Sequence, residues 1–168
     1  EANRLNRLRY LLPLADCGLQ LYGNPAWEGE IKDTPIKNCF YGPLEPFAQY
    51  PKVIQSTKIN VNLRSLQGFT APTHRDFLVP HLNSFLVASK RHGKPIQNEE
   101  EWKRFDLDSF PWPPEADNPQ NMGEFVRFYL DRPNKREEWI TTARREIQQK
   151  HLYTHRMAQL GEILRGYY

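Results

Sequence analysis

Residues 67–76, QGFTAPTHRD, gather side chains that can bind an anion, and an apolar run follows them directly. Thr73 and Asp76 are three residues apart, a spacing typical of a capping box that begins a helix at His74. The start of a helix offers unpaired backbone N–H groups and a partial positive charge, which attract phosphate. His74 and Arg75 add donors there, and arginine suits a bidentate phosphate contact. The stretch predicts a phosphate site, most naturally for a diphosphate.

The loop before this helix belongs to the same predicted site. Arg64 ends the preceding apolar stretch and adds another donor, while Gly68 lets the backbone approach a ligand closely. Thr70 lies in the same loop. An ordinary helix cap with a surface arginine explains the same pattern, and in that alternative Arg75 pairs with Asp76. Composition and periodicity name no reaction.

The elements that must position this site alternate between helix and strand. Ile59, Val61 and Leu63 alternate as in a strand, and the run SFLVAS is typical of a parallel strand covered on both faces. We expect helices over 2–15, 46–56 and 74–82, and strands ending at Gly23, at Gly42, over 58–64 and over 84–89. This order predicts an α/β fold, an open parallel sheet with helices on both faces. Such sheets bind ligands beyond the carboxyl ends of their strands.

The chain changes character after Ser89. Residues of about 90–120 are rich in proline and acidic side chains and predict an irregular insert, which aromatic residues pin to the surface. Three helices are expected over 121–166, the first of them capped by Asn121 with Glu124. The whole of residues 1–168 is thus predicted to be one domain.

Composition narrows the class of protein. The 168 residues are 39% hydrophobic and 26% charged, which favours a packed globule over disorder, and no apolar run is long enough to span a membrane. The net charge of +3 suits an anionic ligand. Basic and acidic residues are interleaved along most of the chain, however, so nucleic-acid binding is a minor alternative. Cys17 and Cys39 have no metal-ligand spacing and are expected to be reduced, with a disulfide as the lesser alternative. We therefore expect a cytoplasmic protein.

The order of several motifs resembles a known family. The segments are LQLYGNPAW, CFYGPLEPFAQYPKVIQSTKINVNLR, APTHRDFLVPHLNSFLV, MGEFVRFYLDRPNKREE and KHLYTHRMAQLGEIL. Together they resemble the C-terminal, donor-binding domain of GT-B fold glycosyltransferases, most closely the CgeB-like (spore maturation protein) group. The resemblance implies one Rossmann-like half of a GT-B fold, whose N-terminal acceptor domain lies outside this chain. It also implies that the last helix packs back against the sheet or against the other domain.

The resemblance implies a function and roles for individual residues. It implies transfer of a sugar from a nucleotide-sugar donor to an unknown acceptor, with no cofactor and no required metal. Gly42 would lie at the nucleotide-facing end of a strand, and Thr73, His74 and Arg75 would lie at the donor diphosphate. The family's donor-binding Glu is replaced by Leu78, so the ribose contact is either lost or taken over by another group such as Asp76.

One further position departs from the family, and the departures bear on function. The small glycine that often ends the family's helix is replaced by Asn83. This change and the missing Glu keep open a second function, that of a non-catalytic structural or interaction module derived from a GT-B half. As a fragment, the chain is expected to be inactive alone, because the catalytic base belongs to the other half.

Overall fold

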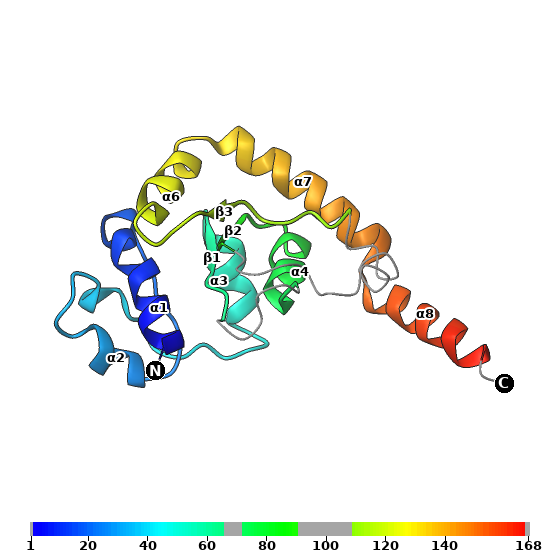
Figure 1. Cartoon of the computed structure of the whole chain (residues 1–168), viewed down its shortest axis with the longest axis horizontal. Helices are drawn as coiled ribbons and strands as arrows, with labels where there is room; N and C mark the ends of the chain where they lie inside the picture. The colour runs from blue at the N-terminus through cyan, green and yellow to red at the C-terminus, as the bar shows by residue number, and fades with distance from the viewer. Residues whose placement is uncertain (1, 66–71, 91–108, 167–168) are drawn as a thin grey trace.

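An open sheet of three parallel strands lies at the centre of the computed structural model, which describes residues 2–65, 72–90 and 109–166 (Figure 1). The strands follow the order β1-β2-β3, with bounds Asn60–Asn62, Leu86–Ser89 and Glu115–Ala116. Both pairings are parallel, and Asn60 lies opposite Leu86 in the first. The two strands predicted within 58–64 and 84–89 are confirmed.

Helices precede, cover and follow this sheet. Their bounds are Ala2–Leu11 (α1), Ala26–Ile31 (α2), Tyr50–Ser56 (α3), His74–His81 (α4), Met122–Leu130 (α6), Pro133–Lys150 (α7) and Tyr153–Arg165 (α8), with 3-10 helices at Leu12–Cys17 (η1) and Lys37–Cys39 (η2). The helix predicted over 2–15 becomes 3-10 near Pro13, because proline cannot donate an α-helical hydrogen bond. Pro133 instead opens α7, where the missing donor costs little.

The two faces of β2 pack against different helices. Phe85 and Val87 belong to a buried cluster that includes side chains of α1 and α6, whereas Leu86 packs with Ile54 of α3 and Val79 of α4. All four residues of β2 are buried. A strand covered on both faces must be apolar throughout, as the run SFLVAS is. The predicted α/β class, with helices on both faces of a parallel sheet, is confirmed.

The two strands predicted to end at Gly23 and Gly42 are the main correction to the expected sheet. Their residues join only through one parallel bridge, Leu21 to Phe40, supported by a hydrogen bond from Gly23 N to Gly42 O of 3.0 Å. Left-handed backbone at Gly18 (φ 70°) and Gly42 (φ 83°) turns the chain close to this bridge. The extended runs are therefore too short to join the described sheet.

The segment of about 90–120 contains more regular structure than expected. Its described part, residues 109–120, supplies β3, where Ala88 lies opposite Glu115. A strand of two residues has no hydrophobic alternation to reveal it in the sequence. Phe110 is buried against Phe77 and Trp112, as the aromatic composition indicated. Two other aromatic residues expected to pin this segment, Trp102 and Phe105, lie outside the described residues.

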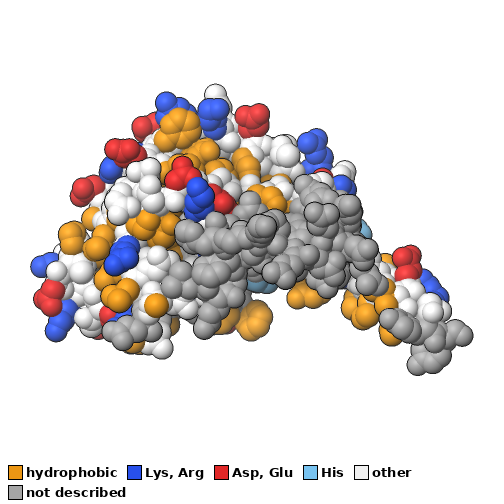
Figure 2. All heavy atoms as spheres, in the orientation of Figure 1, with side chains coloured by type: hydrophobic (Ala, Val, Ile, Leu, Met, Phe, Trp, Pro, Cys, Tyr) orange, Lys and Arg blue, Asp and Glu red, His pale blue; other side chains and the backbone are white. Residues whose placement is uncertain are grey.

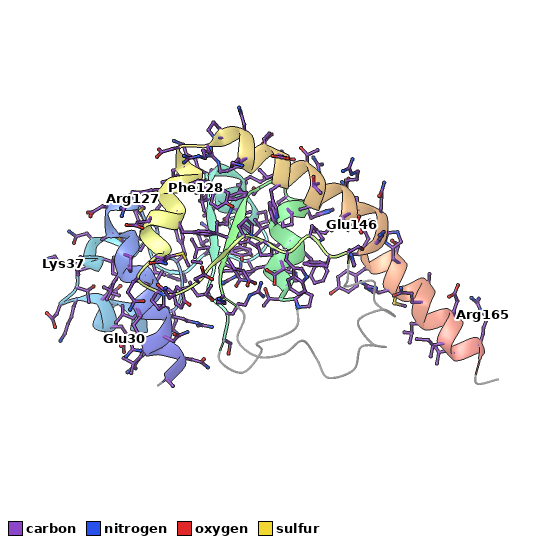
Figure 3. All side chains as sticks on the ribbon, turned by 45° about the horizontal axis from the view of Figure 1, so that its top comes forward. Glu30, Lys37, Arg127, Phe128, Glu146 and Arg165 are labelled. Carbon is purple, nitrogen blue, oxygen red and sulfur yellow. The ribbon has the colours of Figure 1, made fainter. Side chains whose placement is uncertain are left out.

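The predicted C-terminal helices are present, but the last one projects from the body (Figure 1). α8 has no buried residue, and Met157 and Leu160 are 63% and 46% exposed. Arg165 lies near its free end (Figure 3). His151 packs against the rings of Phe77 and Phe110 where α7 ends, and the chain turns outward after it. The tail therefore does not pack back against the sheet, one of the two positions expected for it.

No described helix combines the length and the apolar character that a membrane span needs.

Candidate functional site at the start of helix α4

The strongest local prediction, a helix starting at His74, is confirmed together with its cap. Thr73 is the N-cap of α4, and its backbone N–H donates to Asp76 Oδ2 at 2.6 Å. The Thr73 hydroxyl donates to the same oxygen at 3.0 Å, and Asp76 N donates back to Thr73 O at 2.9 Å. Asp76 thus fixes the first turn of α4. Its negative charge also suits the positive end of the helix dipole.

The inner side of this helix start is a buried network of charged and polar groups. Arg64 Nη1 donates to Asp76 Oδ2 at 3.1 Å, and Arg64 Nη2 donates to Glu115 Oε1 at 3.3 Å. Asn62 Nδ2 donates to Thr73 Oγ1 at 2.8 Å and lies 3.3 Å from Asp76 Oδ1. The network joins the carboxyl end of β1 and the first residue of β3 to the first turn of α4. It therefore sets the position of the helix start relative to the sheet.

Burial decides what Arg64 and Asp76 can do. Their side chains are 1% and 0% exposed, and both oxygens of Asp76 already accept hydrogen bonds. Arg64 also lies over the Trp112 ring, 5.7 Å from its centre, and its Nε has no hydrogen-bond partner among the described residues. These two residues were predicted to contact the donor. Both side chains are buried beneath the helix start, where their ion pair and hydrogen bonds support it.

The outer side of the helix start is open. His74 and Arg75, the first two residues of α4, are both exposed. Arg75 Nε donates to the Tyr50 hydroxyl at 3.3 Å. The alternative in which Arg75 pairs with Asp76 is wrong, because Arg64 occupies that carboxylate from below. Arg75 is thus a cation presented at the surface, at the positive end of the α4 dipole.

A cavity of about 510 Å³ opens beside Arg75, within the range typical of small-molecule sites. Its lining includes residues 19–22 and the strand residues Ile59, Asn60 and Val61. Side chains of α3 and α4 complete it, among them Tyr50 and Arg75. The interior is lined largely by leucine, isoleucine and valine side chains. A ligand with an apolar portion and an anionic end could place the first against these side chains and the second beside Arg75.

The remaining predicted site residues lie at different distances from this centre. Gly42 has a left-handed backbone and precedes Leu44, which lines the cavity. Gly68 and Thr70 lie outside the described residues. Leu78, where the resemblance leads us to expect a Glu, packs against the cluster of Ile54 and Val79. The structure therefore brings Arg64, Thr73, His74, Arg75 and Asp76 together and leaves Leu78 in the core.

A neighbouring pair of charges occupies the same edge of the sheet. Lys90 follows β2, Asp117 follows β3, and Lys90 Nζ lies 2.9 Å from Asp117 Oδ1. This hydrogen bond and the charge of Asp117 raise the pKa of Lys90 above its usual value. Lys90 is therefore a cation that already has an anionic partner, whereas Arg75 has none within the part of the chain that the structure describes.

Sequence reasoning missed three residues of this site. Tyr50, Asn62 and Glu115 all contact a predicted site residue. Asn62 had a usable signal: the alternation of Ile59, Val61 and Leu63 places it on the other side of the strand, before the polar helix start. Tyr50 and Glu115 had none, because their contacts span 25 and 51 positions of the chain.

Neither a metal centre nor a concentrated basic surface is evident. The described residues contain no group of three or more His, Cys, Asp or Glu side chains arranged for a metal ion. Cys17 and Cys39 are both free. On the face shown in Figure 2, basic and acidic side chains are intermixed rather than gathered in one patch. That distribution gives no support to the nucleic-acid alternative.

Comparison with known proteins gives one match. The model of a family described as glycosyl transferase-like matches residues 5–162. The match covers α1 through most of α8, including the whole of the site around α4. No curated protein and no solved structure matches significantly.

Proposed function

This chain belongs to the glycosyl transferase-like family, and we propose that it is the donor-binding half of a GT-B glycosyltransferase, closest to the CgeB-like group. The donor is a nucleotide-sugar, and its diphosphate binds at the start of α4. The observation that carries this proposal is Arg75, exposed at that helix start beside a cavity of about 510 Å³.

The proposed chemistry is the stabilisation of a leaving group. Negative charge grows on the nucleotide diphosphate as the bond to the sugar breaks. Arg75 and the free N–H groups of the first turn of α4 offset that charge without a metal ion. The apolar cavity takes the nucleoside portion. The acceptor and the catalytic base come from a second domain, so this chain binds the donor without completing the transfer.

Asp76 does not contact the ribose in this proposal, although the sequence suggested it for that contact. Its full burial beneath the helix start, where it accepts hydrogen bonds from Thr73, Asn62 and Arg64, separates it from a ribose hydroxyl at the surface. The ribose is therefore bound by another group or by water. This difference keeps the non-catalytic module as the competing function.

Calorimetric titration with UDP, GDP and ADP tests the proposal. The wild-type chain binds at least one of them, and a metal chelator leaves its affinity unchanged. Arg75→Ala weakens that binding by about 1.5–3 kcal/mol, as expected for a hydrogen bond to a charged group. Arg165→Ala, at the far end of α8, is the matched control and binds as the wild type does.

Two results would contradict the proposal. The first is that the wild-type chain binds none of the three nucleotides, which is what the non-catalytic module predicts. The second is that Arg75→Ala binds as tightly as the wild type.

A further inference from the structure

The guanidinium of Arg75 is held by a single side chain. Within the described residues its one hydrogen bond runs from Nε to the Tyr50 hydroxyl, at 3.3 Å. Both residues line the cavity of about 510 Å³ beside α4. An exposed arginine otherwise samples many rotamers, and fixing it costs free energy when a ligand binds. A partner that holds the side chain in advance reduces that cost.

Tyr50 is well placed to be such a partner. It is the first residue of α3, and its backbone N–H donates to Glu45 O at 3.1 Å. Its ring is partly buried against the cluster that contains Ile54 and Val79. Val79 is one helical turn beyond Arg75 on α4. The phenol therefore stands on the core that also supports the helix carrying Arg75.

The atom that Tyr50 engages matters for the chemistry. Arginine has five N–H donors, and Nε carries only one of them. The bond to Tyr50 leaves the four N–H groups of Nη1 and Nη2 available. A phosphate oxygen pair can then be bound bidentately through the end of the guanidinium.

We propose that Tyr50 is a positioning residue for the donor diphosphate: it orients Arg75 so that Nη1 and Nη2 face the cavity. This inference rests on the proposed function, because it assumes that Arg75 binds the diphosphate. Tyr50 itself touches no phosphate and acts only through Arg75.

Tyr50→Phe tests the inference by removing one oxygen and leaving the ring. With the nucleoside diphosphate that the wild-type chain binds best among UDP, GDP and ADP, we expect affinity to fall about three- to tenfold, the value of one hydrogen bond. Tyr153→Phe is the matched control, because Tyr153 is also the first residue of a helix but lies far along the chain on exposed α8. That control binds as the wild type does.

A double-mutant cycle separates positioning from a general structural effect. If Tyr50 acts through Arg75, Tyr50→Phe causes no further loss in an Arg75→Ala background. An Arg75→Lys background gives the same result, because lysine has one nitrogen and cannot bond to Tyr50 and chelate a phosphate in the same way. Equal losses in all backgrounds would overturn the inference and assign Tyr50 to the shape of the cavity.

The outcomes distinguish this inference from the function on which it rests. If Arg75→Ala weakens binding but Tyr50→Phe binds as the wild type does, only the positioning role fails. If the wild-type chain binds none of the three nucleotides, the proposed function fails and the inference fails with it. Melting temperatures of the ligand-free variants, expected to match that of the wild type, show that each variant is folded.

Discussion

Two arginines lie on opposite sides of the same helix start, and their surroundings assign them different roles. The side chain of Arg64 is 1% exposed and is paired with Asp76 and Glu115. Arg75 is exposed and bonds only a neutral hydroxyl among the described residues. A buried cation must be neutralised within the protein, whereas an exposed one can remain available to an anion. Charge alone therefore does not mark a binding residue, because the burial and the partners of a charged side chain decide whether it can reach a ligand.

The difference follows from the elements that carry the two residues. Arg64 lies two residues after Asn62, the last residue of β1, and both side chains bond to the start of α4. Packing of the helix against this side of the strand encloses Arg64. Arg75 is the second residue of α4, and its side chain is exposed. Arg64 consequently contacts the helix start from the buried side, next to the sheet, and Arg75 lies at the same helix start on the side exposed to solvent.

The largest expected effect is on the buried side. Asp76→Ala leaves the Arg64 guanidinium with Glu115 as its remaining anionic partner among the described residues. It also removes the carboxylate that completes the capping box of α4. We expect unfolding free energy to fall by about 3–5 kcal/mol, as when one partner of a buried ion pair is removed. Chemical denaturation monitored by circular dichroism measures it.

The control for Asp76 is an exposed aspartate in a visible ion pair. Asp117 pairs with Lys90, and its side chain is 73% exposed. Asp117→Ala should change stability by no more than about 1 kcal/mol. Equal destabilisation by the two substitutions would show that burial does not separate these pairs.

An intermediate effect is expected at the rim of the buried network. The Glu115 side chain is 19% exposed and accepts a hydrogen bond from Arg64. Glu115→Gln retains an acceptor but removes the charge, so stability should fall by about 0.5–1.5 kcal/mol. The same denaturation experiment measures it, and a loss as large as that of Asp76→Ala would show that the two carboxylates are equivalent.

The smallest effect on stability is expected on the outer side. Arg75→Ala removes an exposed side chain, and the unfolding free energy should change by no more than about 0.5 kcal/mol. The same variant is expected to lose nucleotide affinity, so its stability and binding separate. A loss of stability comparable to that of Asp76→Ala would place Arg75 among the supporting residues instead.

The sequence predicts the start of α4 better than it predicts the residues that surround it. Thr73 and Asp76 are three residues apart, so the cap depends on local geometry and was visible in the pattern. The alternation around β1 and the apolar run of β2 were visible for the same reason. The partner of Asp76 was not, because Arg64 lies twelve positions away and the sequence offered Arg75 as a closer candidate.

The elements that were missed are those without a local period. β3 has two residues in a proline-rich stretch, and only its pairing with β2 makes it a strand. The runs before Gly23 and Gly42 have strand-like composition, yet they form one bridge and stay outside the described sheet. In each case, the outcome depended on a partner distant in the chain.

The sequence by itself determined the α/β class, the position and cap of α4, and the presence of cations around its start, because these depend on periodicity and on spacings of a few residues. Only the tertiary structure decided which arginine is buried, that Asp76 is fully engaged, and that Tyr50 holds Arg75 beside a cavity. Those features depend on contacts between segments far apart in the chain, where desolvation and the available partners determine whether a charge supports the fold or faces a ligand.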